Sequence, residues 1–302
     1  MPPYLGETHE TVLKFLQRAK KVLAEFSDPL ETENILSAVD KIETGSNAAK
    51  ASVDIALQDL AGKMQNKSCH EIFGADKTKN LFTAYTIPID NSTGIEKRIK
   101  EANDYKILKV KLGSADDKKL IEEIRKHTDK EIIVDANEGW TDKNFTLEMV
   151  HWLSEKKVSL VEQPMPKEMI EETAWLMEKS PLPIIADEAV KRLPDIENAK
   201  GVYNGINIKL MKCTGLNEAQ KMISLARKYQ MKILLGCMSE TSCAVSAAAQ
   251  IAPFADWIDL DGPLLIKEDY FEGVKFSEGK IILNDKPGIG VFPIASLSFL
   301  SR

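Results

Sequence analysis

The chain has 302 residues, of which 43% are apolar and 28% are charged, and 40 Lys and Arg against 46 Asp and Glu give a net charge of −6. This balance excludes wholesale disorder, and the acidic sign argues against nucleic-acid binding through phosphate contacts. No apolar run approaches the roughly 18 residues that a membrane span needs, and the N-terminus shows no signal-peptide pattern. The four cysteines have no CxxC spacing, so we expect reduced thiols in a cytoplasmic protein without a membrane partner.

The first part of the chain has a helical pattern. Thr8 or Thr11 is placed to cap a helix over Glu10–Phe26, and a second helix is predicted over Ala48–Met64. The second segment is rich in small residues, which suggest close helix packing: Ala48, Ala49, Ala51, Ala56 and Ala61.

From about Leu81 onwards, short β-rich runs alternate with amphipathic segments. The runs expected to form strands are Leu81–Ile87, Ile107–Lys111, Ile132–Asp135, Ser159–Glu162, Ile184–Asp187, Gly205–Leu210, Lys232–Gly236 and Trp257–Leu260. Helical patterns between them include Asp116–His127, Asn144–Glu155, Glu168–Lys179 and Leu216–Tyr229. Eight such βα units favour a TIM barrel. The alternative is an open Rossmann-type sheet, but no strand is followed by a GxGxxG turn.

Polar and charged residues gather at the predicted carboxyl ends of these strands, where barrel enzymes carry their chemistry. They are Lys109, Lys111, Asp135, Asn137, Glu162, Asp187, Glu188, Lys209, Glu240, Asp259 and Asp261. Any one of them alone is more often a helix cap or a solvated charge. Their coincidence at one end of otherwise apolar strands indicates a site, because a buried charge needs a partner or a metal.

Three acids from successive strands, Asp135, Glu162 and Asp187, are expected to converge at one mouth of the barrel. Oxygen ligands suit a hard divalent cation, most simply Mg²⁺, and the lack of Cys and His in the set argues against zinc. Lys111 and Lys209 lie on strands four places apart in an eight-stranded ring. They can therefore approach a metal-bound substrate from different faces.

Five motifs follow one another in order: Lys-Val-Lys at 109–111, Asp-Ala-Asn at 135–137, Val-Glu-Gln-Pro at 161–164, Ala-Asp-Glu at 186–188 and Asn-Ile-Lys-Leu at 207–210. From about Tyr4 to about Gly290 the chain resembles the muconate-lactonizing-enzyme subgroup of the enolase superfamily. The resemblance implies an α/β fold, a (β/α)7β modified TIM barrel with an α+β capping domain. It also implies Mg²⁺ on the three acids, Lys111 and Lys209 as acid/base catalysts, and Lys109 as the accompanying lysine.

The segment from Asp259 to Pro263, Asp-Leu-Asp-Gly-Pro, resembles the Asp-x-Asp signature of the dipeptide epimerases. A dipeptide has a free α-ammonium that Asp259 and Asp261 can hold, whereas a muconate or succinylbenzoate substrate has none. Without a cation the two carboxylates would repel each other. We therefore expect an isomerase that inverts the α-carbon of the C-terminal residue of a dipeptide, L-Ala-D/L-Glu or a related one.

The expected reaction is a two-base 1,1-proton transfer. Removing the α-proton gives an enediolate, whose charge Mg²⁺ on the substrate carboxylate would stabilise. Lys111 and Lys209 would exchange the proton on opposite faces. Lys109 and Glu240 are further candidates for substrate contacts, and Asn137 and Glu188 are expected to orient the acids or lysines beside them.

We expect residues 1–78 to form the helical part of the capping domain, residues 79–262 the barrel, and residues 263–302 a segment that returns to the capping domain. The family's initial three-stranded meander and closing loop have no counterpart in the sequence, so we expect an N-terminally truncated capping domain. A small dipeptide substrate and a homo-oligomer are also expected. The alternatives are a muconate cycloisomerase or another racemase or lyase of the subgroup, and a truncated non-catalytic homologue. Intact Lys111 and Lys209 argue against the last.

Overall fold

The centre of the molecule is a nearly closed ring of eight parallel strands in the order β1 to β8. The computed structural model describes residues 5–79, 81–88 and 92–294. A backbone bridge between Thr83 and Ile258 joins the two edge strands and completes the ring. The strands are β1 (Ala84–Ile87), β2 (Ile107–Lys111), β3 (Glu131–Asp135), β4 (Val158–Glu162), β5 (Ile184–Ala186), β6 (Gly205–Ile208), β7 (Lys232–Gly236) and β8 (Trp257–Asp259).

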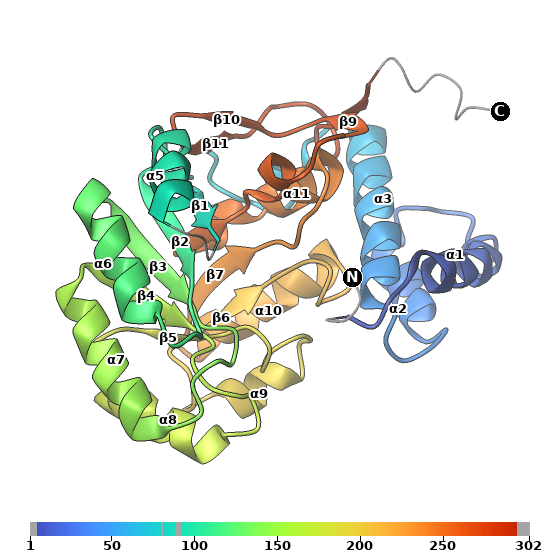
Figure 1. Cartoon of the computed structure of the whole chain (residues 1–302). Coiled ribbons are helices and arrows are strands. Elements are labelled where there is room, and N and C mark those ends of the chain that lie inside the picture. Colours follow the sequence, from blue (N-terminus) through green and yellow to red (C-terminus); the bar gives the residue numbers. More distant parts are fainter. Residues whose placement is uncertain (1–4, 80, 89–91, 295–302) are drawn as a thin grey trace.

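A helix follows each of the first seven strands and packs outside the ring (Figure 1). These helices are α5 (Ser92–Glu101), α6 (Asp117–His127), α7 (Lys143–Glu155), α8 (Ile170–Lys179), α9 (Asp195–Ala199), α10 (Leu216–Lys228) and α11 (Ser242–Ala249). A 3₁₀ turn, η1 (Ala252–Phe254), precedes β8. The element directly after β8 is a second 3₁₀ turn, η2 (Gly262–Leu265), in place of an α-helix. The predicted (β/α)7β barrel is therefore confirmed, and the open doubly wound alternative is wrong.

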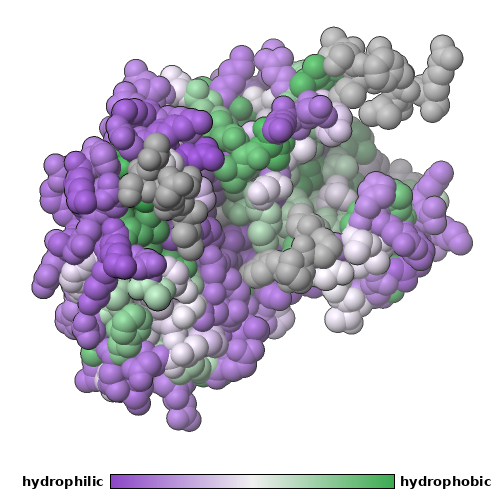
Figure 2. All heavy atoms as spheres, viewed as in Figure 1, coloured by the Kyte–Doolittle hydropathy of each residue, from purple (hydrophilic) through white to green (hydrophobic). Residues whose placement is uncertain are grey.

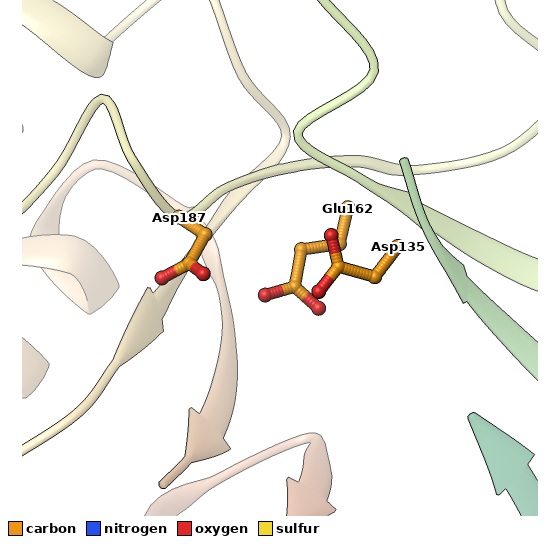
Figure 3. A group of neighbouring side chains, drawn as sticks. All are labelled: Asp135, Glu162 and Asp187. Carbon is orange, nitrogen blue, oxygen red and sulfur yellow. The ribbon is translucent and has the colours of Figure 1, made fainter. Parts of the chain in front are cut away.

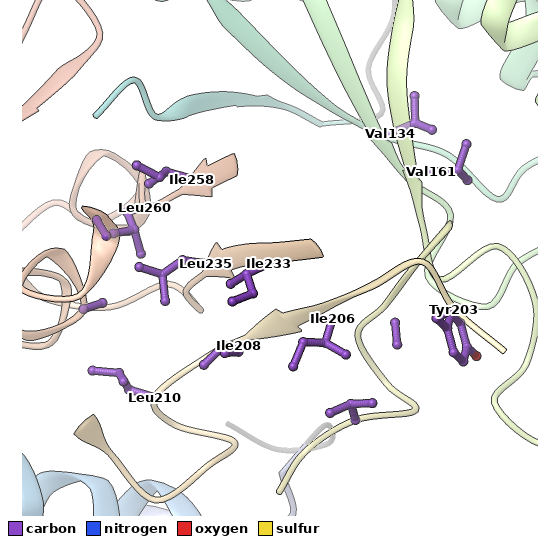
Figure 4. Close-up of a cluster of buried hydrophobic side chains, with 14 of the residues drawn as sticks. Val134, Val161, Tyr203, Ile206, Ile208, Leu210, Ile233, Leu235, Ile258 and Leu260 are labelled. Atoms are coloured by element: carbon purple, nitrogen blue, oxygen red, sulfur yellow. The ribbon is translucent and has the colours of Figure 1, made fainter. Parts of the chain in front are cut away.

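Side chains alternate along each strand between the barrel interior and the surrounding helices. One interior layer is apolar and contains Ala84, Ile133, Leu160, Ile185 and Leu234. Outward-facing residues such as Val134, Val161, Ile206, Ile208 and Leu235 form the main hydrophobic core with the helices (Figure 4). Two residues beyond the interior layer, the same strands carry Thr86, Asp135, Glu162, Asp187 and Gly236. The two-residue alternation of the strands thus places a mostly polar interior layer next to the apolar one, nearer the carboxyl ends of the strands.

The N-terminal helices form a separate group beside the barrel: α1 (His9–Leu23), α2 (Thr32–Asp40), α3 (Asn47–Gln65) and α4 (Cys69–Ile72) (Figure 1). They enclose a core of their own, which includes Phe15, Ile35 and Val53. Thr8 caps α1, because its side chain accepts a hydrogen bond from the Thr11 amide at 3.2 Å. The helix therefore begins one residue before the predicted start, at His9, and ends at Leu23 rather than Phe26.

The C-terminal segment returns to these helices and forms two short antiparallel pairs, β10 (Lys275–Ser277) with β11 (Lys280–Ile282) and β9 (Phe271–Glu272) with β12 (Phe292–Pro293). Gly288 passes so close to α3 that a Cβ on Gly62 would lie 2.6 Å from its Cα, so the small residue is needed there. Asp59 also accepts a hydrogen bond from the Ile289 amide at 3.0 Å. Residues 1–4 and 295–302 of the expected capping segments lie outside the described residues.

In the view of Figure 2 the surface around α6 is largely hydrophilic, whereas white and green side chains interrupt the purple over α7 and α8. Across the part of the chain that the structure describes, no helix is both long enough and apolar enough to span a bilayer.

Candidate active site

Three carboxylates meet at the carboxyl end of the barrel. Asp135 ends β3, Glu162 ends β4, and Asp187 directly follows β5. Asp135 and Glu162 are register partners on neighbouring strands. All three are almost completely buried, and one oxygen of each lies within 4.8 Å of the others (Figure 3). The structure thus brings together the acids that the sequence places at successive strand ends.

This acidic group fits a hard divalent cation. Burial and the charge of Asp135 raise the pKa of Glu162 to about 7. Burial also opposes ionisation of Asp187, but Lys209 and Lys212 hold its pKa well below the usual range. Glu162 Oε2 is buried and its one close partner is the Lys109 ammonium, 2.7 Å away. Three carboxylates that offer only oxygen ligands, close enough together to share one ion, are what Mg²⁺ prefers.

Lys109 links the acidic group to the eighth strand. Its Nζ lies 2.7 Å from Glu162 Oε2, 2.7 Å from Asp259 Oδ2 and 3.2 Å from Asp135 Oδ2. The side chain is buried, which favours the neutral form, yet the three carboxylates raise its pKa well above the usual value. Lys109 therefore carries a positive charge that pairs with Asp135 and Glu162 on one side and with Asp259 on the other.

Lys111 and Lys209 face each other across the acids from β2 and from the end of β6. Lys111 Nζ lies 2.7 Å from Asp135 Oδ2, and its side chain is 34% exposed. Lys209 Nζ lies 2.6 Å from Asp187 Oδ2, and its side chain is 7% exposed. Burial alone would lower the pKa of Lys209, but Asp187 and Glu162 raise it. The two lysines thus reach the acids from strands that lie four places apart in the ring, and both line the same cavity.

Asn137 joins one lysine to the acids. Its Oδ1 accepts from Lys111 Nζ at 3.1 Å, its amide donates to Asp135 Oδ1 at 3.0 Å, and its Nδ2 donates to Glu188 Oε1 at 3.1 Å. Burial, together with Asp187 and Asp135, raises the pKa of Glu188. The two residues expected to orient their neighbours are therefore in direct contact with each other, and Asn137 also contacts Lys111 and Asp135.

Asp259 is the last residue of β8, and Asp261 follows it by two residues. Asp261 Oδ2 accepts from the Thr86 amide at 2.8 Å, and burial next to Asp259 raises the pKa of Asp261 to about 6. Asp259 Oδ2 pairs with Lys109, but its Oδ1 is buried and has no hydrogen-bond donor. The pair therefore retains acceptor capacity for a cation.

A cavity of about 250 Å³ connects these groups. Eight of the site residues predicted from the sequence line this cavity: Lys109, Lys111, Asn137, Asp187, Glu188, Lys209, Asp259 and Asp261. The other lining residues are Thr86, Cys237, Met238, Ser239 and Leu265. The volume is of the order of a small-molecule site. Charged side chains and a few apolar ones, such as Met238 and Leu265, share its lining.

Glu240 is placed differently from the other candidates. Among the described lining residues, Met238 and Ser239 come from the loop after β7, and Glu240 does not line the cavity. Glu240 Oε1 instead accepts from the Met238 amide at 2.7 Å, and burial raises its pKa to about 7. Its contacts shape the loop that carries Met238.

Three polar residues that the sequence reasoning missed support the acids. Asn207 Nδ2 donates to Glu162 Oε1 at 2.6 Å, and Gln163 Oε1 accepts from the Asp187 amide at 2.9 Å. Lys212 Nζ donates to Asp187 Oδ1. Asn207 could have been found, since it precedes Lys209 by two residues and shares its face. Lys212 lies in a turn, where no periodicity marks it.

Comparison with known proteins agrees with this geometry. The family model described as "Enolase C-terminal domain-like" matches residues 95–294, and the model for the mandelate racemase / muconate lactonizing enzyme N-terminal domain matches residues 6–74. A curated L-Ala-D/L-Glu epimerase from Bacteroides thetaiotaomicron is 52% identical over 97% of this chain and 76% of its own length. A hydrophobic dipeptide epimerase from a Flavobacteria bacterium is 33% identical over 81% of this chain and 72% of its own length.

Solved structures give the same assignment. The structure of a dipeptide epimerase from Cytophaga hutchinsonii, complexed with Mg and D-Ala-L-Val, superposes with a TM-score of 0.91 at 26% identity, over 98% of this chain and 83% of that one. The chain therefore belongs to the mandelate racemase/muconate lactonizing enzyme family of the enolase superfamily and, within it, is an isomerase of the dipeptide epimerase kind.

Proposed function

We propose that the protein is a Mg²⁺-dependent dipeptide epimerase that inverts the α-carbon of the C-terminal residue. The observation that carries this proposal is Asp259, whose buried Oδ1 has no hydrogen-bond donor and which lines the same cavity as Lys111 and Lys209. A buried carboxylate oxygen gains most from a charged donor. The free α-ammonium of a dipeptide is such a donor, and Asp261 beside it adds a second acceptor.

Asp135, Glu162 and Asp187 would hold the Mg²⁺. When bound, the cation would supply attraction for the substrate carboxylate and for the negative charge that develops as the α-proton leaves. Asp135 and Asp187 are also the partners of Lys111 and Lys209. The same carboxylates therefore anchor the ammonium groups on both sides of the reacting carbon.

Lys111 and Lys209 carry the proton transfer. One lysine, in its neutral form, accepts the α-proton of one epimer, and the ammonium of the other returns a proton to the opposite face. Positioned acid/base groups of this kind contribute about 10²–10⁴-fold each. Lys111 is held by Asn137 Oδ1 as well as by Asp135, so its amine has a defined direction.

For the substrate we propose L-Ala-D/L-Glu first, because the relative at 52% identity carries that name. A second candidate is a dipeptide with an apolar second residue. The cationic side chains among the described lining residues, Lys109, Lys111 and Lys209, are all paired with acids. Met238 and Leu265 line the same cavity and suit an apolar side chain.

The test is incubation of the protein and Mg²⁺ with a dipeptide library in deuterated water, followed by mass spectrometry. Free dipeptides should gain one mass unit, and their N-acetyl derivatives should react at least about tenfold more slowly, since acetylation removes the ammonium charge. Asp261→Asn should lose activity, whereas Asp285→Asn, an exposed surface acid, should not. Equal rates for free and acetylated substrates would remove the dipeptide assignment and favour another racemase or lyase of the subgroup.

A further inference from the structure

Lys212 is a buried lysine in the turn after β6, only 1% exposed, and it does not belong to the described lining of the cavity. Its Nζ lies within hydrogen-bonding distance of four oxygens: Asp187 Oδ1, the Asp187 carbonyl at 2.7 Å, the Val190 carbonyl at 2.9 Å and the Asn207 carbonyl at 3.0 Å. An ammonium has three protons, so every donor position is used. No proton of Lys212 remains for a substrate.

These contacts join three segments of the barrel mouth. Asp187 and Val190 belong to the segment after β5, and Asn207 belongs to β6. Lys212 therefore ties the end of one strand to its neighbour at the residue that carries the third acid of the site. The capping helices contact the same residue, because Asn47 Nδ2 at the start of α3 donates to the Lys212 carbonyl at 2.8 Å.

The two oxygens of Asp187 have different lysine partners. Oδ2 pairs with Lys209, which lines the cavity, and Oδ1 pairs with Lys212, which does not. If Lys209 turns toward a substrate, Lys212 still holds the carboxylate. We propose that Lys212 is a positioning residue that fixes the direction of the Asp187 carboxylate, and with it the affinity of the acidic group for a divalent cation.

Charge and geometry predict opposite changes in the cation affinity of the site when this lysine is lost. Coulomb's law alone says that removing a positive charge beside a cation site tightens cation binding. The positioning role says that binding weakens, because Asp187 Oδ1 and three carbonyl oxygens lose their donor and the carboxylate loses its direction. Removing groups that hold a metal ligand typically costs about 10–100-fold in affinity. The sign of the change therefore separates the two roles.

The experiment is titration of the substrate-free, full-length protein with Mn²⁺, following free Mn²⁺ by electron paramagnetic resonance. Lys212→Met should weaken Mn²⁺ binding by about 10–100-fold. The matched control is Lys50→Met, since Lys50 is also buried and donates to one carboxylate and two carbonyls, those of Asp40 and Glu43, away from the site. Lys50→Met should leave Mn²⁺ affinity within about twofold of the wild type. Circular dichroism checks that each variant is folded.

Activity gives a second readout. The Mg²⁺ concentration for half-maximal epimerisation should rise in Lys212→Met by the same factor as the Mn²⁺ dissociation constant, while kcat at saturating Mg²⁺ should fall less. If Lys212→Met does not fold, Lys212→Arg replaces it, since a planar guanidinium keeps the charge but cannot reproduce the four contacts of the ammonium, and weaker Mn²⁺ binding is again expected.

The positioning role of Lys212 rests on the metal site of the proposed function, and different results would overturn each of them. Wild-type protein that binds no Mn²⁺ would overturn both. Wild-type protein that binds Mn²⁺, with equal or tighter binding in the Lys212 variant, would overturn the positioning role alone.

Discussion

The carboxylate of Asp187 illustrates how charges at this barrel mouth depend on one another. It is buried, and each of its oxygens pairs with a different lysine. Three acids so close together would repel one another in a medium of low dielectric. Lysines from β2, from the end of β6 and from the turn after it offset that repulsion, and a bound divalent cation would add to them.

Asp187→Asn removes one of the three charges from the acidic group. We expect epimerisation to fall by at least about 10³-fold and Mg²⁺ affinity to fall as well, because a neutral amide is a weaker ligand for a hard cation. The measurements are turnover of L-Ala-D/L-Glu and calorimetric Mg²⁺ titration.

The matched control for this substitution is Asp117→Asn. Asp117 is also buried at this end of the barrel, but it accepts from the Gly113 amide and Trp140 Nε1 instead. Its variant should keep Mg²⁺ affinity. Unchanged Mg²⁺ affinity in Asp187→Asn would contradict the role assigned to this acid.

The two lysines that face each other should each be indispensable for inversion. Lys111→Ala and Lys209→Ala should each stop epimerisation while the fold remains intact, because each supplies the proton acceptor on one face. One variant can still exchange the α-proton of one substrate epimer with solvent. Lys232 is half-exposed at the amino end of β7, away from the site, so Lys232→Ala should react like the wild type. Near-normal epimerisation in either active-site variant would disprove the two-base mechanism.

The sequence predicts most of these side chains but not their supports. Alternation along strands fixes which face Asp135, Glu162 and Lys209 occupy, so their convergence follows once the barrel is assumed. Lys212 lies in a turn and Gln163 follows the end of β4, where strand alternation no longer shows the direction of a side chain. Glu240 follows the seventh strand, as expected, but its hydrogen bond to Met238 comes from a loop conformation that the sequence does not reveal.

Among the elements, strands were predicted more completely than helices. Each barrel strand overlaps its predicted run, although Leu81 and Phe82 pair with the C-terminal segment instead of extending β1. No predicted helix covers α2, α4, α5, α9 or α11. α9 has only five residues, and α11 reads as an almost uniformly small, apolar stretch, so neither shows a clear helical stripe.

The contact between α3 and α10 depends on a glycine. Gly215 has a φ of 116°, and a Cβ there would lie 2.1 Å from Asp54 Oδ2. Asp54 is buried and accepts from the Asn217 amide at 2.9 Å, so it cannot retreat without losing that bond. Gly215→Ala should therefore lower the free energy of unfolding by at least about 3 kcal/mol.

Gly201→Ala is the control for backbone strain alone. Gly201 has a φ of 78°, but nothing lies within 4 Å of the Cβ that alanine would add. It should cost roughly 1 kcal/mol in urea unfolding. Equal losses in the two variants would show that crowding against Asp54 contributes nothing.

Asp54 also predicts a pH dependence of stability. Burial raises its pKa from 3.8 to about 6, despite the hydrogen bond from the Asn217 amide. The folded state therefore binds a proton more tightly than the unfolded chain, and this group adds stability as the pH falls through about 6 toward 4. Relative to Asp54→Asn, the wild type should gain about 1 kcal/mol between about pH 7.5 and about pH 5. A difference that stays constant with pH, in urea unfolding at both values, would contradict the raised pKa.

For the whole molecule, the barrel brings distant segments to one cavity and the capping helices support it from one side. Asn47 and Asp54 of α3 contact the segment between Lys212 and Asn217, which follows the strand that carries Lys209. The catalytic end of the barrel and the capping unit are thus joined beside the active site. The proposed epimerisation requires proton exchange at one carbon of one class of substrate.

The most direct measurement of that claim is the position of deuterium after reaction in deuterated water. The protein with Mg²⁺ is incubated with L-Ala-L-Glu, and the product epimers are analysed by proton NMR and fragment mass spectrometry. We predict one deuterium on the α-carbon of the C-terminal residue in both epimers and none on the N-terminal residue, with no exchange after chelation of Mg²⁺. Deuterium on the N-terminal α-carbon, or exchange that persists without a divalent cation, would contradict the account.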